Sequence, residues 1–343
     1  MPLANTGRAA PLLILLATSL TLPCLTGCGS DITRPAGGTT SGPAPLSSTL
    51  YMAASSATQV LPVQVTATST VTGTALNVPS FLSVTLLAVD PKGNLYVGGT
   101  VSGNAQQCEV LVYPAGASGS ATPTRSVVLE PGALTALAAD SSGQIYAGQS
   151  NTLSSVKVYA ATANGSSTAS VVLNPTSFRY INDVAVDTTG RIFVSGYNGG
   201  AYFIDTFAAG ASGAATPTAT LYAPSGSYFG GIALDASGNL WAVEQLTIVE
   251  FAPGASGTPT PLTSINLQPV TAPYTGQTYS NVLRIDSNGY LYIPVVETGA
   301  SVVTGFTAIY SPTQSGTPLP LETVTSNDII TTSVGSSIPL AVR

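Results

Sequence analysis

An eleven-residue motif recurs five times in this chain of 343 residues, and it restricts the fold more than any other feature. Its first copy reads Leu87-Ala-Val-Asp-Pro-Lys-Gly-Asn-Leu-Tyr-Val97. The aspartates of the five copies stand at positions 90, 140, 187, 235 and 286, so the spacings are 50, 47, 48 and 51 residues. A regular period of this length indicates an array of similar supersecondary units, each stacked on its neighbours.

The motif predicts a β-hairpin. Short apolar β-formers flank Asp-x-x-Gly, in which the aspartate accepts backbone N–H bonds and the glycine supplies a positive φ. A second motif follows each copy; its first example is Val112-Tyr-Pro-Ala-Gly-Ala-Ser-Gly119. This motif predicts the end of a third strand and a turn, and a short apolar run after it predicts a fourth strand. Four strands in about 45–50 residues is typical of one blade of a β-propeller.

Both ends of the chain contain partial units. Residues 49–53 and 60–66 resemble the two outer strands of a blade, and residues 329–342 resemble an inner hairpin with Ser333 in the place of the aspartate. Together these ends would make a sixth blade. We therefore predict an all-β, six-bladed β-propeller over residues 49–343, with four antiparallel strands per blade and a ring closed by the N- and C-terminal strands. Five blades with both ends outside the ring is the alternative.

The repeated hairpin, of the form Ala-x-Asp-x-x-Gly-Asn-Leu-Tyr-Val, resembles the NHL-repeat family of six-bladed propellers and the wider gluconolactonase-like superfamily. The resemblance covers residues from about 48 to the end, but the Asn-His-Leu signature of the family is absent because the chain has no histidine. Enzymes of that superfamily hold a metal ion with acidic, Asn or His side chains. No such ligand set can be transferred to this sequence.

The N-terminus predicts export. Arg8 precedes an apolar run from Pro11 to Leu22, which is about half the ~20 residues that a membrane-spanning helix needs, and a run of this kind is typical of a signal peptide. The segment Leu25-Thr-Gly-Cys28 resembles the lipobox of bacterial lipoproteins, in which the cysteine is acylated and becomes the mature N-terminus. We expect a signal peptide over residues 1–27 and lipidation at Cys28. An ordinary signal peptide that contains a cysteine is the alternative.

Residues 28–48 are rich in Gly, Pro, Ser and Thr and predict a flexible tether. Gly29 follows Cys28, where an aspartate is associated with inner-membrane retention in lipoproteins of enteric bacteria. We therefore expect an anchor in the outer membrane of a bacterial envelope.

Composition excludes several classes of function. The chain has no histidine, so His-based acid–base catalysis and imidazole metal sites are excluded. Nine Lys and Arg residues against 15 Asp and Glu residues make nucleic-acid binding a poor interpretation. Cys108 would be the one cysteine that remains after processing and acylation, and we interpret it as a small buried apolar residue.

The repeated aspartates suggest a ring of metal ligands. Their position, with one aspartate in each hairpin turn, instead favours a structural role. The aromatic residues six positions after each aspartate (Tyr96, Tyr146, Phe193, Trp241 and Tyr292) alternate with apolar residues and are predicted to pack between blades. We expect no cofactor and assign no metal ligand.

Functional residues should lie where the chain departs from its own repeat, in the connections between blades and between the second and third strands of a blade. Both sets open on one face of a propeller. They concentrate aromatic and amide side chains with very few charges, which suits sugar or peptide surfaces. The candidate binding residues are Arg179, Tyr180, Asp183, Tyr197, Tyr228, Glu244, Tyr279 and Glu297.

The sequence therefore favours a lipid-anchored, non-enzymatic module that binds a partner protein or a glycan through this loop face. The alternative is a metal-dependent enzyme of the gluconolactonase or lyase type, with Glu244, Glu297 and Asp183 around a divalent ion. A propeller that only stacks within an envelope assembly, and loop aromatics that only pack on the ring, are two further alternatives.

Overall fold

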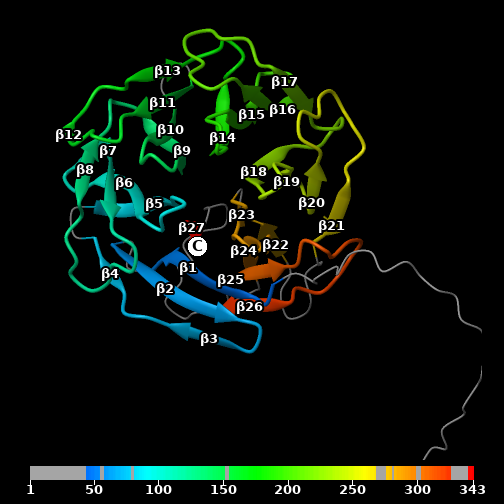
Figure 1. Ribbon diagram of the computed structural model, residues 1–343, viewed down its shortest axis with the longest axis horizontal. Helices are drawn as coiled ribbons and strands as arrows, with labels where there is room; N and C mark the ends of the chain where they lie inside the picture. Colours follow the sequence, from blue (N-terminus) through cyan, green and yellow to red (C-terminus); the bar gives the residue numbers. More distant parts are fainter. Residues whose placement is uncertain are drawn as a thin grey trace, which may run out of the picture. The chain divides into compact units, whose positions relative to one another are not determined.

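The computed structural model describes residues 44–54, 58–78, 81–150, 154–267, 276–279, 282–298, 303–325 and 339–343. All of them belong to the second of two compact units, Gly42–Arg343. They form six sheets that are arranged as blades around a central axis, and within each sheet the strands of the blade itself run antiparallel (Figure 1). The predicted all-β, six-bladed propeller is confirmed. In these ranges no helix has the length and the apolar character needed to cross a bilayer.

The strands of each blade follow one another from the centre of the ring outward. Blade 1 contains β27 (Leu340–Val342), β1 (Ser47–Ala53), β2 (Gln59–Thr66), β3 (Ser69–Thr72) and β4 (Leu76–Asn77). Blade 2 contains β5 (Phe81–Val89), β6 (Leu95–Val101), β7 (Asn104–Tyr113) and β8 (Arg125–Val128), and β12 (Gly165–Ser166) joins it at the rim. Blade 3 contains β9 (Ala133–Ala139), β10 (Ile145–Ser150), β11 (Ser155–Tyr159) and β13 (Val171–Leu173).

Blades 4 to 6 repeat this order. Blade 4 contains β14 (Tyr180–Val186), β15 (Ile192–Tyr197), β16 (Tyr202–Phe207) and β17 (Ala219–Tyr222). Blade 5 contains β18 (Phe229–Leu234), β19 (Leu240–Glu244), β20 (Thr247–Phe251) and β21 (Thr263–Asn266). Blade 6 contains β22 (Gly276–Tyr279) and β23 (Arg284–Ile285), which both pair with β24 (Leu291–Thr298), then β25 (Val303–Tyr310) and β26 (Glu322–Thr325).

The two ends of the chain close the ring in blade 1, as predicted, but they share the strands differently. Strand β1 is the second strand of the blade and not an outer one, because Leu50 pairs with Val342 as Leu95 pairs with Val89 in blade 2. The N-terminal segment therefore supplies every strand of blade 1 outside β27. In this register Arg343 takes the place of the repeated aspartate. Ser333, which the sequence suggested for that place, lies outside the described residues.

Each repeated aspartate holds its hairpin together, which confirms its structural role. In blade 2, Oδ1 of Asp90 accepts hydrogen bonds from the backbone N–H groups of Lys92 and Asn94, both at 2.9 Å. Its Oδ2 accepts one from the hydroxyl of Tyr96 at 3.1 Å. The same aromatic partner serves the aspartates of three other blades: Tyr146 for Asp140, Trp241 for Asp235 and Tyr292 for Asp286. A local carboxylate thus satisfies both the turn and a buried aromatic donor.

In blade 4 a charged side chain replaces the aromatic hydrogen-bond donor to the repeated aspartate. The equivalent aromatic residue is Phe193, which has no donor, and Nε of Arg191 instead donates to Oδ2 of Asp187 at 2.7 Å. The Arg191 guanidinium also lies 5.6 Å from the centre of the Phe193 ring. Side-chain hydrogen bonds from Thr189 and Arg191 hold the pKa of the Asp187 carboxyl below its usual value, against the opposing effect of partial burial.

The second repeated motif joins neighbouring blades. Its last glycine in blade 2, Gly119, donates its N–H to the carbonyl of Ala75 and accepts from the N–H of Asn77, at 2.9 and 2.8 Å. Equivalent parallel bridges join Leu173 to Gly213, Leu221 to Gly257 and Ile265 to Gly316. The backbone at Gly119 has a φ of 61°, a conformation that favours glycine. The predicted turn therefore also ties each of blades 2 to 6 to the outer strand of the blade before it.

The core consists of apolar clusters between adjacent blades. Trp241 of blade 5, for example, packs in one cluster with Leu291 and Ile293 of blade 6. Cys108 is buried in the cluster between blades 2 and 3 and is unpaired, as predicted. Because each blade covers one face of the next, no blade could keep its apolar side chains from water alone.

Candidate functional site

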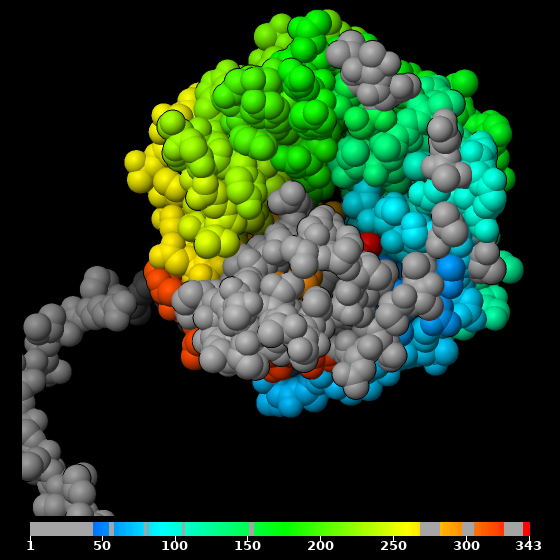
Figure 2. All heavy atoms as spheres, turned by 180° about the vertical axis from the view of Figure 1, so that it is seen from behind, coloured from blue at the N-terminus to red at the C-terminus, as the bar shows by residue number. Residues whose placement is uncertain are grey.

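Four tyrosines lie in contact along one face of the ring, and we call them the tyrosine row: Tyr180, Tyr197, Tyr202 and Tyr228. Their ring centres are 6.4, 4.8 and 5.8 Å apart in that order. Three of them occupy ends of strands β14, β15 and β16, and Tyr228 directly precedes β18. The row therefore runs from blade 4 to the entry of blade 5. These strand ends belong to the face that Figure 2 views, where blades 4 and 5 are the green and yellow sector.

The two outer members of the tyrosine row are open to solvent. Tyr180 is 54% exposed and Tyr228 is 36% exposed, whereas Tyr197 and Tyr202 between them are partly buried. Tyr222, at the end of β17, is also exposed. In the described part of the chain, these three are the only exposed aromatic side chains, and all come from blade 4 or from its connection to blade 5.

The loop that carries Tyr228 is held by the tight turn between β19 and β20. The side-chain amide of Gln245 donates to the carbonyl of Gly226 at 2.6 Å, and its backbone N–H donates to the carbonyl of Tyr228 at 3.2 Å. Oε1 of Glu244 accepts a hydrogen bond from Ser227 at 3.1 Å. Gln245 has a φ of 52°, a positive value that no other non-glycine residue has in the described ranges. The predicted residue Glu244 thus helps to position the tyrosine row.

A bulge in β18 is supported from blade 4. Register shifts between Phe229 and Ile232, which leaves backbone groups without partners in their own sheet. The amide of Asn182 donates to the carbonyl of Phe229 at 2.8 Å, and the hydroxyl of Ser195 donates to that of Gly230 at 2.7 Å. Oδ2 of Asp183 accepts from the N–H of Ile232 at 3.1 Å. These polar side chains fix the backbone directly after Tyr228.

Asp183 differs from its prediction. The sequence placed it in a solvent-facing loop, but it lies within strand β14 and is 3% exposed. The register of β14 shifts between Ile181 and Asp183, and this bulge breaks the alternation of the strand, so that Asp183 reaches the interior toward blade 5. Its partners are the backbone N–H groups of Ile232 and Val184 and the guanidinium of Arg284, which lies 2.9 Å from its Oδ2. Burial raises the pKa of the Asp183 carboxyl, and the hydrogen bonds and the Arg284 charge only oppose this effect.

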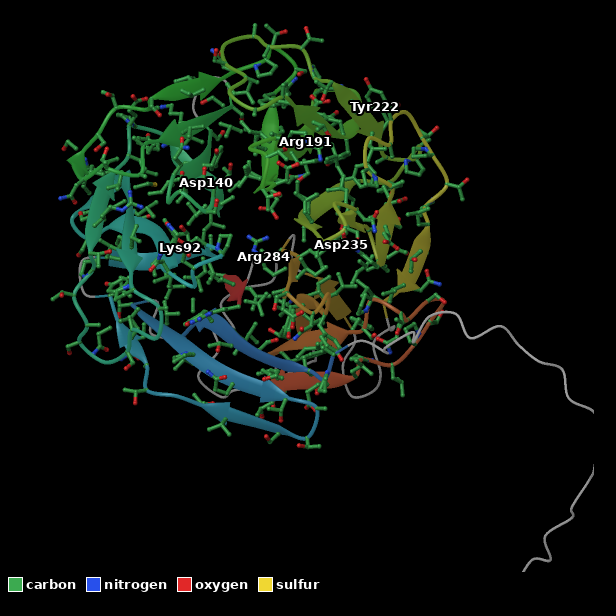
Figure 3. The ribbon with its side chains drawn as sticks, in the orientation of Figure 1. Lys92, Asp140, Arg191, Tyr222, Asp235 and Arg284 are labelled. Carbon is green, nitrogen blue, oxygen red and sulfur yellow. The ribbon has the colours of Figure 1, made fainter. Side chains whose placement is uncertain are left out.

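Arg284 lines the central channel of the ring (Figure 3). The channel holds a cavity of about 160 Å³, and apart from Arg284 the residues that line it have apolar side chains. The second position of the hairpin motif is alanine in blades 2 to 5 (Ala88, Ala138, Ala185 and Ala233), and all four alanines line the channel. Arg284 is the charged exception to this repeat. The departure from alanine was visible in the sequence, but its partner Asp183 was not.

The other predicted residues are placed as follows. Arg179 is exposed beside the tyrosine row, and its N–H donates to the carbonyl of Tyr197 at 3.1 Å. Tyr279 and Glu297 belong to the paired strands β22 and β24 of blade 6, but their side chains lie outside what the structure describes. Cys28 also lies outside the described residues. Tyr202 and Tyr222 also stand in irregular connections that the sequence places on this face, but they are not among the candidate binding residues.

The acidic residues of the enzyme alternative that the structure describes are engaged within the protein. Within the described ranges, no three His, Cys, Asp or Glu side chains are grouped so that they could hold a metal ion. Asp183, which the enzyme alternative needs as a ligand, is engaged by Arg284 and a backbone amide. Glu244 is hydrogen-bonded to Ser227. What the described residues expose on this face is aromatic and amide surface with few charges.

No protein-family model and no curated protein sequence matches this chain. Among solved structures, a protein from Lactobacillus plantarum matches with a TM-score of 0.52 at 14% identity, over 83% of this chain and 84% of its own. A protein of unknown function from Bacteroides caccae matches with a TM-score of 0.54 at 7% identity, over 87% and 99%. A protein from Bacteroides fragilis, provisionally named a 6-phosphogluconolactonase, matches with a TM-score of 0.50 at 11% identity, over 84% of both chains. At such identities the likeness shows the fold alone.

Proposed function

We propose that this protein is a lipid-anchored β-propeller module, related in its repeat to the NHL type, that binds a partner protein or a glycan through its tyrosine row. The observation that carries this proposal is the row itself, in which four tyrosine rings touch in series with Tyr180 and Tyr228 open to solvent. Tyrosine supplies a large contact area at a small cost in side-chain entropy, and its hydroxyl can still form hydrogen bonds.

The surroundings of the tyrosine row favour a neutral or weakly charged ligand. Arg179 and Glu244 are the charged side chains that the structure describes at the row, and Glu244 already bonds to Ser227. The supporting hydrogen bonds of Gln245 and Asn182 hold the backbone on both sides of Tyr228. A surface that is ordered before binding loses less entropy when its ligand arrives.

The anchor belongs to the same proposal. An acylated Cys28 would fix the chain in the outer membrane of a bacterial envelope. Residues 28–43 of the predicted tether would separate the propeller from the lipid surface, since Leu46 is buried in the core and Ser47 already begins β1. About fifteen residues of this composition span roughly 21 Å as a coil. This distance leaves the loop face accessible to a partner in the periplasm or at the cell surface.

The test uses the full-length protein in detergent on a glycan array and in crosslinking pull-downs from envelope extracts. We expect the Tyr180→Ala/Tyr228→Ala double variant to lose about 2–3 kcal/mol of affinity for the ligand so found, with its melting temperature nearly unchanged. Leu319→Ala is the matched control, since Leu319 is 74% exposed in blade 6. Unchanged ligand capture by the double variant would refute the proposal.

The enzyme alternative makes a different prediction. A metal-dependent lactonase or lyase would need Glu244, Glu297 and further oxygen ligands around a divalent ion, because Asp183 is engaged by Arg284. Elemental analysis of the purified full-length protein, followed by a lactone-hydrolysis assay, tests this alternative. Stoichiometric metal that is lost in Glu244→Gln would favour the enzyme over the binding module.

A further inference from the structure

A cavity of about 420 Å³ lies at the rim of the ring between blades 1 and 2, away from the tyrosine row. Its walls come from Asn77 in β4, from Glu109, Leu111 and Tyr113 in β7, and from the turn of residues 120–123. Figure 1 shows β4 and β7 on the side of the ring opposite β20 and β21. The volume is in the range of small-molecule sites, which is roughly 300–1,000 Å³.

Glu109 is the only charged side chain among the described residues that line this cavity. It is 8% exposed, and its Oε1 accepts a hydrogen bond from the hydroxyl of Ser126. The three ion pairs in the described ranges involve Lys157, Arg191 and Arg284, so none of them neutralises Glu109. Burial of a carboxylate is expensive unless a cation or several hydrogen bonds compensate it. The protein compensates the Glu109 carboxylate with one hydroxyl group, and the cavity lies beside this carboxylate.

Asp205 in blade 4 is a comparable buried acid. It also lies on the third strand of its blade, is 3% exposed, and accepts a hydrogen bond from a fourth-strand hydroxyl, Thr220, at 2.5 Å. Burial raises the pKa of the Asp205 carboxyl, and Thr220 opposes this effect. Asp205 does not line the rim cavity. Glu109 and Asp205 are therefore comparable buried acids, but of the two only Glu109 lines the rim cavity.

We infer that the rim cavity binds a small organic cation, whose ammonium group pairs with the Glu109 carboxylate. Leu111, Tyr113 and Pro123 provide apolar walls for the organic part of the ligand. At the mouth, the amide of Asn77 lies within 3.5 Å of the Ser120 hydroxyl, and both groups line the cavity. This combination suits a compact primary amine with a short alkyl chain, because the amine contributes the missing charge and the chain displaces water from the apolar walls.

The test is calorimetric titration of the full-length protein in detergent with n-butylammonium, and with n-butanol and butyrate as neutral and anionic probes of similar shape. We expect n-butylammonium to bind in preference to both. Glu109→Gln should weaken amine binding at least about 30-fold, the usual scale for removal of one partner of a buried charge pair. Asp205→Asn should leave amine binding unchanged.

Equal binding of the amine and the alcohol, absence of amine binding at high millimolar concentration, or unchanged affinity in Glu109→Gln would each overturn the inference. If Glu109→Gln does not fold, the Thr122→Trp variant tests the inference instead, because Thr122 is exposed in the turn and lines the cavity. The added indole should occlude the space and abolish amine binding while the fold is retained. Full amine affinity in a folded Thr122→Trp protein would place the amine elsewhere.

Discussion

Nη1 of Arg284 lies 2.9 Å from Oδ2 of Asp183, although the two residues are 101 positions apart in the sequence. They belong to the inner strands of blades 6 and 4, and the N–H of Ile232 in blade 5 donates to the same carboxylate oxygen at 3.1 Å. One buried carboxylate therefore links three of the six blades at the channel wall. The contact also supports the bulge that follows Tyr228, so it connects the channel to the tyrosine row.

Loss of the Arg284 charge should be strongly destabilising. Arg284→Met leaves the Asp183 carboxylate buried without a counter-charge, and we expect the free energy of unfolding to fall by about 3–5 kcal/mol. The Asp183→Asn/Arg284→Met double variant should recover part of this loss, because no charge is then buried. Urea denaturation at pH 8 measures both values. Arg191→Met, which breaks a more exposed pair, is the control and should cost less than about 1 kcal/mol.

The same contact gives a defined pH dependence. The folded-state pKa of Asp183 is raised, so the folded state holds this proton more tightly than the unfolded state. The corresponding stability is present below the unfolded pKa of about 3.9 and is lost as the pH rises through the folded pKa. The deficit of Arg284→Met relative to wild type should therefore shrink when denaturation is repeated near pH 4. A deficit that stays constant with pH would contradict this assignment.

Alkaline pH should unfold the propeller through its buried tyrosines. Burial, assisted by the neighbouring carboxylates Asp90 and Asp140, raises the pKa of Tyr96 and Tyr146 to about 12. Stability from these groups is complete below the unfolded pKa of about 10 and is lost as the pH rises to about 12. We expect the urea midpoint to drop steeply over this interval. A Tyr96→Phe/Tyr146→Phe protein should show a shallower drop, and an equal drop would rule these tyrosines out as the cause.

Ring closure should depend on very few residues. Strand β27 pairs with β1 through three residues, and Leu340 within it is 1% exposed in the cluster between blades 1 and 6. We expect Leu340→Ala to lower the free energy of unfolding by about 2–5 kcal/mol, whereas Leu319→Ala on the surface should change it by less than about 0.5 kcal/mol. Thermal and urea unfolding provide the comparison. Similar small effects of both substitutions would show that β27 does not close the ring in solution.

Cys28→Ala should release the protein from membranes. The motif Leu25-Thr-Gly-Cys28 ends a short apolar run, and a diacylated cysteine anchors a chain stably where one acyl chain does not. We expect the variant to move to the soluble fraction and to incorporate no labelled fatty acid. Retention of Cys28→Ala in washed membranes would argue for another mode of attachment.

The repeat in the sequence was sufficient to predict the number of blades, their hairpins and the role of the repeated aspartates. These properties depend on residues close together in the chain: Asp90 bonds to Lys92, Asn94 and Tyr96, all within six positions. The spacing of these residues along the chain is therefore sufficient to predict such contacts. The same spacing also marked Tyr180, Tyr197 and Tyr228 as departures from the repeat, although it could not show that Tyr202 joins them in one row.

Only the assembled ring determines which of these departures from the repeat contact each other. Asp183 and Arg284 each break the repeat, but their contact depends on the curvature of the ring, because blades 4 and 6 are brought close at the channel while their outer strands are far apart. A bulge between Ile181 and Asp183 then turns Asp183 inward while Tyr180 stays in solvent. Ring closure likewise made β1 a second strand, since its partner β27 lies at the other end of the chain. Contacts of this range depend on the summed geometry of all the blades, which no local pattern records.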